Sequence, residues 1–147
     1  MKKLNQRLRK LREKNHYTQK QVANATDISF DAYRGYEYQD VEPNIEYLIK
    51  IAEFYDVSVE YILGIQEDSG VSKYFDKGNN TPFPIRLREL RKKARLTQQQ
   101  MATLINKNMR TYRRYEKGEN FPSIEILITL ADIFHVTIDD LIGRKAL

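Results

Sequence analysis

Basic side chains are concentrated in one short stretch, residues 108–118, with the sequence Asn-Met-Arg-Thr-Tyr-Arg-Arg-Tyr-Glu-Lys-Gly. If this stretch is helical, its tyrosines and glutamate share one side, and the other side carries four cations: Arg110, Arg113, Arg114 and Lys117. Like charges three or four residues apart in a helix repel one another. A bound polyanion would turn that repulsion into attraction, and arginine matches the O6/N7 edge of guanine in a DNA major groove. The stretch therefore favours binding of duplex DNA.

Residue patterns typical of enzyme sites are missing from the sequence. It contains no serine–histidine–aspartate set, no paired carboxylates, no metal-ligand spacing and no phosphate-binding glycine loop. His16 and His135 fall in a predicted loop and a predicted turn and do not match each other in the repeat described below. We therefore expect no enzyme activity, no metal site and no cofactor.

Composition bounds the class of protein. The chain has 147 residues, a net charge of +5, a pI near 9.3 and no cysteine. Lack of cysteine fits a reducing compartment, and neither a membrane span nor a signal-peptide core is visible, so we expect a cytoplasmic protein without a membrane partner. The charge is uneven: residues up to Glu67 sum to −1, and those from Pro82 onward sum to +6. A nucleic-acid surface is therefore expected in the second half.

The sequence contains an internal duplication. A shift of 79 positions places residues 7–64 on residues 86–143 without a gap. Roughly twenty positions then match in type, including a Tyr-Arg-x-Tyr-Glu motif that begins at Tyr33 and again at Tyr112. Two copies indicate a duplicated domain rather than a solenoid, which needs at least three. The predicted organisation is a first domain over residues 1–66, a linker over 67–82 and a second domain over 83–147.

Each copy is predicted to form five helices and no strand. Leu4, Leu8 and Leu11 mark the apolar side of the first helix, and Thr18 opens the second with a Thr-x-x-Gln capping box. Turns are expected at Asp27 and Asn106, and caps or helix starts at Asn44, Ser58, Ser123 and Thr137. The four tyrosines of the repeated motif, Tyr33, Tyr36, Tyr112 and Tyr115, are expected to pack in the cores. The fold class is all-α: two tandem five-helix bundles.

The ordered set of motifs resembles the Cro/C1 (XRE-type) helix-turn-helix family, whose DNA-binding domain has the λ-repressor-like fold. The motifs are Arg-x-Leu-Arg, Thr-Gln, Tyr-Arg-x-Tyr-Glu and Pro-x-Ile-Glu, and each occurs in both halves at the same spacing. None of them is specific alone, but their order and spacing cover nearly the whole chain twice. The resemblance implies that the third helix of each copy is a recognition helix.

The resemblance also implies residue roles in the second copy. Base-facing positions would be Asn108, Met109, Arg110 and Arg114. Positions nearer the DNA phosphates would be Gln98, Thr111, Arg113, Lys117 and Asn120. It further implies structural ion pairs that tie the first helix to the end of the third: Arg12 with Glu37, and Arg91 with Glu116.

The first copy departs from this pattern. Asp31 replaces Arg110, Gly35 replaces Arg114, and Phe30 and Tyr38 make the same surface apolar. Two alternatives remain, and we favour the first. Either this copy has become a homodimer or protein-partner surface, or it still contacts DNA weakly with help from a Lys2–Lys3 arm. The residues concerned under either alternative are Gln19, Ser29, Phe30, Asp31, Arg34 and Tyr38.

We predict a sequence-specific, double-stranded DNA-binding transcriptional regulator, most simply a repressor, that reads the major groove with residues 108–117. The alternative is a protein-interaction module, such as an anti-repressor or antitoxin-type partner binder, built on the same scaffold. The basic stretch favours DNA, whereas the acidic and aromatic residues 29–40 favour a protein partner.

Overall fold

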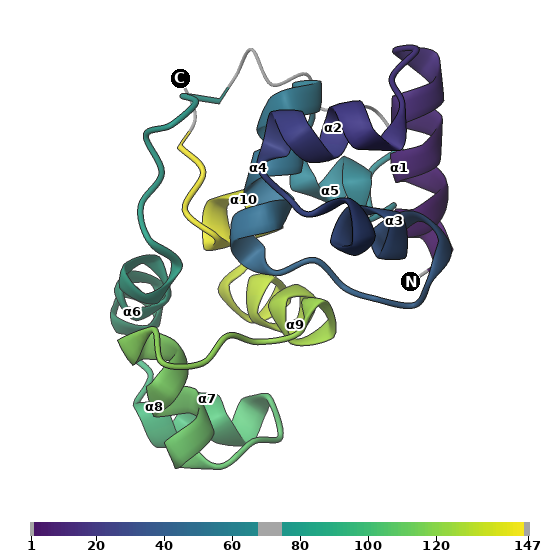
Figure 1. Cartoon of the computed structure of the whole chain (residues 1–147). Helices are drawn as coiled ribbons and strands as arrows, with labels where there is room; N and C mark the ends of the chain where they lie inside the picture. Colours follow the sequence, from purple (N-terminus) through teal and green to yellow (C-terminus); the bar gives the residue numbers. More distant parts are fainter. Residues whose placement is uncertain (1, 68–74, 146–147) are drawn as a thin grey trace. The chain divides into compact units, whose positions relative to one another are not determined.

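The structure is a computed structural model that describes residues 2–67 and 75–145. The chain divides into two compact units, Met1–Tyr74 and Phe75–Leu147 (Figure 1). The first unit contains α1 (Lys2–Lys14), α2 (Gln19–Thr26), α3 (Phe30–Tyr38), α4 (Ile45–Tyr55) and α5 (Val59–Ile62). The second contains α6 (Phe83–Lys93), α7 (Gln98–Leu104), α8 (Met109–Lys117), α9 (Ile124–Phe134) and α10 (Ile138–Leu141). The predicted all-α class with five helices in each copy is confirmed.

Side-chain caps explain where the helices begin. Thr18 and Thr97 each form the predicted capping box. The threonine hydroxyl accepts from the backbone N–H of Gln21 (3.1 Å) or Gln100 (3.0 Å), and the side-chain oxygen of that glutamine accepts from the backbone N–H of the threonine. Such caps satisfy backbone N–H groups that have no partner within the helix. Other N-caps come from Ser29, Asn44, Ser58, Asn108, Ser123 and Thr137.

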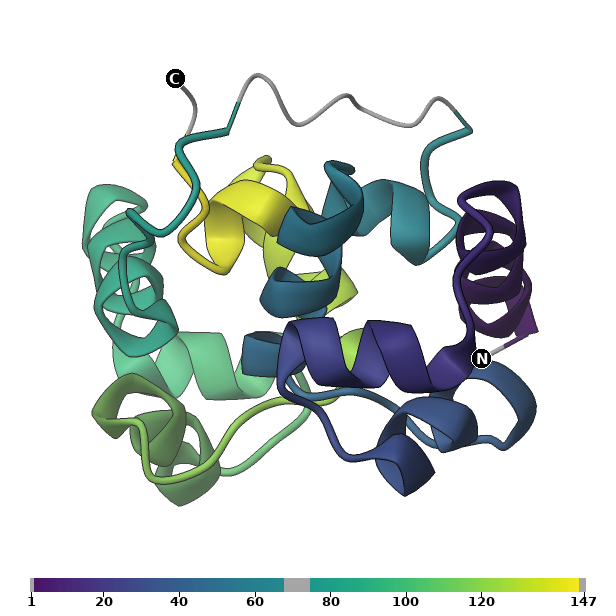
Figure 2. The same cartoon turned by 45° about the horizontal axis from the view of Figure 1, so that its top comes forward.

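Left-handed residues separate the second and third helices of each unit. Asp27 and Asn106 have φ values of 55° and 57°, which confirms the two predicted turns. In Figure 2 the same arrangement is visible within each unit: the first helix stands upright and the second runs across its end. The second and third helices pack against each other across the left-handed turn, α2 on α3 and α7 on α8, which is the arrangement of a helix-turn-helix.

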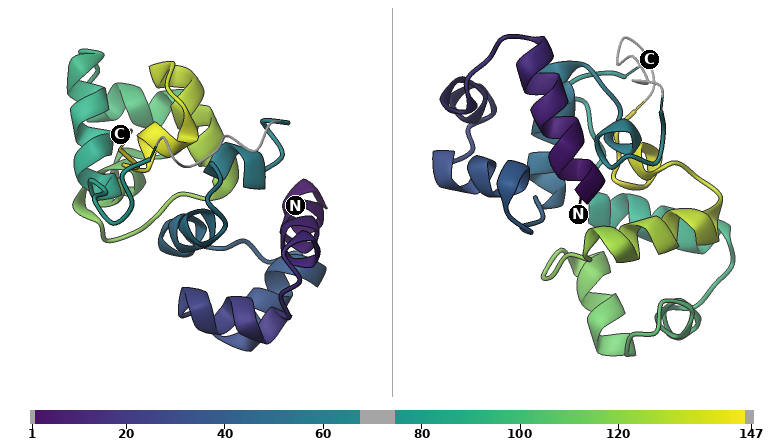
Figure 3. Two further views of the ribbon diagram at one scale, coloured as in Figure 1. Left: turned by 90° about the horizontal axis from the view of Figure 1, so that it is seen from above. Right: turned by 90° about the vertical axis from the view of Figure 1, so that its right-hand side faces the viewer.

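Each unit has its own apolar core. In the first, Leu4, Leu8 and Leu11 of α1 are buried, as predicted, together with Leu48 and Ile51 of α4. The second unit buries the matching residues, and α10 packs against α9 (Figure 3). The buried set in the second unit includes Phe83, Leu87, Leu90, Met101, Leu127, Leu130 and Ile138.

The boundary of the second unit differs from the predicted linker. Residues 75–82 are held against the C-terminal segment: the Asp76 N–H donates to the Lys145 carbonyl and the Thr81 N–H to the Gly143 carbonyl, both at 2.8 Å. The Arg144 guanidinium also lies 4.1 Å from the centre of the Phe75 ring. Half of the predicted linker therefore belongs to the second unit, through backbone bonds that residue types do not reveal. Residues 68–74 of the predicted linker, with Gly70, Val71 and Tyr74, lie outside the described residues.

Candidate nucleic-acid interface

Helix α8 is fixed at both ends by the sequence. At its start, the Asn108 Oδ1 accepts from the Thr111 N–H at 2.8 Å. At its end, Gly118 adopts a left-handed conformation with φ 73°, which glycine tolerates without steric cost. Asn108, which the resemblance placed at a base-facing position, thus has its side-chain oxygen committed to the helix cap.

Two tyrosines hold the inner side of α8. Tyr112 and Tyr115 are buried, and their rings meet edge to face with centroids 6.4 Å apart. Aromatic pairs favour this geometry. Because the two side chains fill the core, the opposite side of the helix must face away from the bundle.

A buried ion pair fixes the tilt of α8 against α6. The Arg91 Nε lies 2.6 Å from Glu116 Oε2, and Arg91 Nη2 lies 3.1 Å from Glu116 Oε1. Burial has the largest single effect on the pKa of Glu116, and it acts to raise that pKa because it disfavours the charged carboxylate. Hydrogen bonds, led by the one from Arg91, outweigh burial and hold the pKa of Glu116 below its usual value. The carboxylate therefore stays charged and paired.

Gln98 joins the same carboxylate. Its Nε2 donates to Glu116 Oε1 at 3.2 Å, so α6, α7 and α8 meet at one glutamate. Sequence reasoning assigned Gln98 to a DNA phosphate and did not anticipate this bond. A signal was available in the sequence, because a glutamine and a glutamate stand 18 residues apart in both copies, Gln19 with Glu37 and Gln98 with Glu116. In the structure, Gln19 Nε2 likewise donates to Glu37 Oε1 at 3.3 Å.

The outward side of α8 carries cations that are not neutralised by the protein. Arg110, Arg113 and Lys117 are exposed, and within the described ranges 2–67 and 75–145 none of them forms an ion pair. Arg114 has one loose partner, Glu119, at 3.8 Å. Met109 and Thr111 are half-buried at the edges of this surface, and Asn120 is exposed in the loop that follows. Of the residues predicted to face DNA, Arg110, Arg113, Arg114, Lys117 and Asn120 are therefore accessible to a ligand, and Met109 and Thr111 are partly accessible.

Helix α3 of the first unit has the same interior and a different exterior. Tyr33 and Tyr36 meet edge to face at 6.5 Å, and Arg12 Nε lies 2.9 Å from Glu37 Oε2. On the outside, Asp31 neutralises Arg34 at 3.3 Å. Ser29 caps the helix in the way that Asn108 caps α8.

Three cations of the first unit lie over aromatic rings. Lys20 Nζ and Arg34 Cζ lie 5.6 Å and 5.5 Å from the centre of the Phe30 ring. The Arg9 guanidinium carbon lies 4.9 Å from the centre of the Tyr38 ring, which is 58% exposed. Cations placed over aromatic faces in this way are held by the ring quadrupole. The positive charge of this surface is therefore engaged within the unit.

The position that matches Arg114 is covered in the first unit. Gly35 is buried, and a Cβ placed there would lie 3.4 Å from Gln39 Oε1 and 3.6 Å from Val41 Cγ2. The chain reaches this place because α3 ends on extended Gln39, φ −118°, instead of a left-handed glycine. The Lys2–Lys3 arm is also absent as such: α1 begins at Lys2, and Lys3 Nζ donates to the Gly64 carbonyl at 3.4 Å.

Sequence reasoning overlooked three cations on α6 and the turn after it: Arg88, Lys92 and Arg95. All three are exposed, and none has an ion pair in the part of the chain that the structure describes. The duplication offered a signal, because the matching residues in the first copy are Arg9, Glu13 and His16, of which only the first is a permanent cation.

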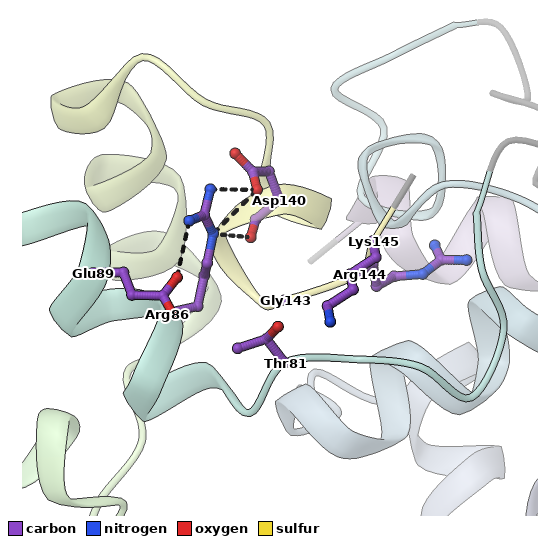
Figure 4. Close-up of a pocket in the computed structure, with 7 residues that line it drawn as sticks. All are labelled: Thr81, Arg86, Glu89, Asp140, Gly143, Arg144 and Lys145. Atoms are coloured by element: carbon purple, nitrogen blue, oxygen red, sulfur yellow. Dashed lines mark hydrogen bonds and ion pairs between the residues drawn. The ribbon is translucent and has the colours of Figure 1, made fainter. Parts of the chain in front are cut away.

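Other features of the two units offer little for chemistry. A pocket between α6 and the C-terminal segment is lined by charged residues that pair with one another, with Arg86 bound to Asp140 at 2.7 Å and to Glu89 at 3.2 Å (Figure 4). His16 and His135 are exposed. Among the described residues no group of three or more histidine, aspartate or glutamate side chains could hold a metal ion. No helix in these ranges has the length and hydropathy needed to cross a membrane.

Comparisons with known proteins agree with this architecture. A helix-turn-helix family model matches residues 8–62 and again residues 87–141. The chain is 43% identical over 63 residues to the uncharacterised HTH-type transcriptional regulator YobD of Bacillus subtilis, covering 43% of this chain and 56% of that protein. It is 43% identical over 61 residues to the cryptic phage CTXphi transcriptional repressor RstR of Vibrio cholerae, covering 42% and 54%.

A third relative and one solved structure are similar. The HTH-type transcriptional regulator AnsR of Bacillus subtilis is 47% identical over 60 residues, covering 41% of this chain and 52% of AnsR. A crystal structure of a transcriptional regulator from Listeria innocua is 43% identical, with a TM-score of 0.40, and the match covers 41% of this chain and 56% of that one. The chain spans about half the length of the curated relatives it matches. With the family model matched twice, the chain belongs to the Cro/C1-type helix-turn-helix family and carries two tandem copies of its domain.

Proposed function

We propose that the protein is a transcriptional regulator that binds duplex DNA and reads its major groove mainly through α8, residues 108–117. One observation carries this proposal: a helix whose inner side is locked by buried tyrosines presents on its outer side three cations, Arg110, Arg113 and Lys117, that have no ion pair among the residues the structure describes. The N-terminal residues of a recognition helix are the ones that reach base edges. The names of the relatives, which describe transcriptional regulators and a repressor, support the same assignment.

Base reading is assigned to Asn108 at the N-cap of α8 and to Met109, Arg110 and Arg114 within the helix. Arg110 and Arg114 are four residues apart and can each present a guanidinium fork to guanine. Met109 cannot form a strong hydrogen bond with a base edge, so we assign it an apolar contact with the thymine methyl group. Asn108 has its amide nitrogen left for a base, since its oxygen caps the helix.

Phosphate contacts are assigned to the rim. Arg113 and Lys117 flank the reading residues, and Asn120 lies in the loop beyond the helix. Thr111 and Gln98 complete this set, with Gln98 also bound to Glu116. Such contacts fix the register of a protein on DNA without reading sequence.

The mode of regulation follows most simply from occlusion. A bound protein without a further effector would block a promoter, so repression is the simplest mechanism, and autoregulation of an antitoxin or immunity type fits equally well. The first unit supports a second role. Because its α3 surface is aromatic, internally neutralised and covered at Gly35, we propose that this unit binds a protein partner or a second copy of the chain. An anti-repressor would use that surface alone.

In-vitro selection of DNA by the full chain tests the proposal. We expect one enriched sequence, bound with a steep dependence on salt concentration because phosphate binding releases counterions. Arg34→Ala in α3 is the matched control for substitutions in α8 and should leave binding unchanged. If no sequence is enriched at low salt, the protein-interaction role replaces the DNA-binding one.

A further inference from the structure

We propose that the phosphate-binding surface of the second unit extends beyond α8 onto α6 and the α6–α7 turn. Arg88, Lys92 and Arg95, which we call the α6 ridge, would bind the sugar-phosphate backbone of duplex DNA beside Lys117. This inference deepens the proposed function and rests on it. The ridge is outside the helix that reads bases, so it adds affinity without adding sequence preference.

The bonds of Arg91 place the ridge next to α8. Arg91 points from α6 to Glu116 on the last turn of α8, at 2.6 Å, and its Nη1 donates to the Leu96 carbonyl at 3.0 Å. The α6–α7 turn is therefore held at the C-terminal end of α8. Arg88 lies three residues before Arg91, and Lys92 lies four residues after Arg88, so these side chains are neighbours on the helix.

The first unit supplies an independent view of the same geometry. Arg9 occupies the position of Arg88, and Tyr38 occupies that of Lys117. There the Arg9 guanidinium donates to the Glu37 carbonyl and lies 4.9 Å from the centre of the Tyr38 ring. Helices α3 and α8 match residue for residue, and α1 and α6 end at matching residues, Lys14 and Lys93, so a side chain at position 88 can reach the surroundings of Lys117 in the same way.

Charge identifies the ligand. The ridge residues and Lys117 are four exposed cations on α6, the turn after it and the last turn of α8, and none of them is paired within the described ranges. Exposed like charges repel, so their gathering favours an anion. In the first unit the matching positions hold Arg9, Glu13, His16 and Tyr38, and Arg9 is engaged by Tyr38. The cluster is therefore a property of the second unit.

The length of the basic surface favours a polymer over a small anion. Seven residues of helix separate Arg110 from Lys117, a distance of about 10 Å along the axis. The ridge continues the surface past that end. A single phosphate would contact only part of it, whereas duplex DNA presents phosphates continuously. The occupant of the ridge is thus the backbone that flanks the bases read by α8.

Salt-dependent titration of the full chain on its selected sequence tests the ridge. Arg88→Ala, Lys92→Ala and Arg95→Ala should each reduce the slope of log affinity against log salt by about 0.9. Equivalently, the affinity lost between 50 and 200 mM salt should shrink by about 3.5-fold for each contact removed. Each substitution should weaken the selected and a scrambled duplex by the same factor.

Lys93→Ala is the matched control. Lys93 is an exposed cation of the same helix, but it lines a different pocket with Leu90, Phe134 and Val136, so its removal should leave the slope unchanged. Circular dichroism checks folding, and glutamine replaces alanine in any variant that melts early. Unchanged slopes in all ridge variants, with the selected sequence still bound through Arg110, would overturn the ridge and leave the proposed function standing. Failure to select any DNA would overturn both.

Discussion

Helices α3 and α8 show what a duplicated domain keeps and what it changes. Each spans nine residues, and the second begins 79 positions after the first. Inside, each has a tyrosine pair with planes at 76° and a glutamate held by an arginine and a glutamine. Outside, one carries four exposed cations, three of them without an ion pair in the described parts of the chain, and the other carries an acid, a glycine and two aromatic residues. The interior that fixes the helix is therefore kept in both copies, whereas the exterior has diverged.

The difference extends to how the helices end. Left-handed Gly118 turns the chain away from α8, so Arg114 stays accessible. Extended Gln39 lets the following residues lie over Gly35. The second copy has its glycine at the end of α8, at Gly118, whereas the first copy has its glycine in the middle of α3, at Gly35. A recognition surface can therefore be lost through backbone conformation as well as through charge.

The largest expected effect comes from removing the arginine of one buried pair. Arg91→Ala leaves Glu116, whose side chain is 4% exposed, without its partner and should cost about 3–5 kcal/mol of unfolding free energy. Affinity for DNA should fall with it, because the tilt of α8 is lost. Arg12→Ala removes the matching partner of Glu37 and should destabilise the first unit without weakening DNA binding. Thermal denaturation and titration check both, and an unchanged melting temperature for Arg91→Ala would contradict the role of the pair.

Next in size is the loss of a base contact. Arg110→Ala should cost about 1–3 kcal/mol of binding free energy and relax the preference at one base pair. Lys117→Ala should instead weaken all sequences alike and flatten the salt slope by roughly one unit. Asp31→Ala, at the position of Arg110 in the first copy, is the control and should change neither. Identical behaviour of the Arg110 and Lys117 variants would show that readers and positioners had been assigned wrongly.

The two glycines should respond in opposite directions. Gly35→Ala introduces a Cβ at ordinary contact distance, 3.4 Å or more from its neighbours, and should stabilise the first unit by about 1 kcal/mol through helix propensity. Gly118→Ala forces a side chain into a left-handed conformation and should destabilise the second unit by about 1–2 kcal/mol. Urea denaturation measures both. A destabilising Gly35→Ala would mean that the covering residues Gln39 and Val41 cannot accommodate even a methyl group.

The smallest expected effect concerns Met109. Replacing thymine by deoxyuridine at the base that it contacts removes one methyl group and should cost about 0.8 kcal/mol of binding free energy. The same replacement should have no effect on a Met109→Ala variant, which has lost the contact from the protein side. A scan of single deoxyuridine substitutions across the selected sequence locates the base. Equal sensitivity of both proteins at every position would exclude a methyl contact by this residue.

Much of the fold could be predicted from the sequence because its signals are local or repeated. The capping boxes at Thr18 and Thr97 mark helix starts by residue type, and Asp27 and Asn106 mark turns because short polar side chains tolerate a left-handed backbone. Because the domain is duplicated, each assignment could be made independently in both copies. Burial of Tyr112 and Tyr115 followed from helical spacing alone.

What could not be predicted depends on distance in space. Residues 75–82 resemble a linker in composition, and only the bonds to Gly143 and Lys145 assign them to the second unit. The link from Gln98 to Glu116 spans 18 residues and is a structural bond in addition to the phosphate contact that the family resemblance implies. The exposed cations of the α6 ridge have no motif, because a helix surface beside another helix is defined by packing. Substitutions between two copies remain the best sequence-level guide to such sites.

The attachment of residues 75–82 has a practical consequence for dividing the protein. Gly143 lies so close to this segment that a Cβ would meet the Thr81 carbonyl oxygen at 1.7 Å, and Phe75 covers the guanidinium of Arg144. A recombinant second half that began at Phe83 would expose Arg144 to water and would lack the two backbone hydrogen bonds from Asp76 and Thr81. Starting at residue 75 preserves them, so eight residues of apparent spacer decide whether that half can be handled alone.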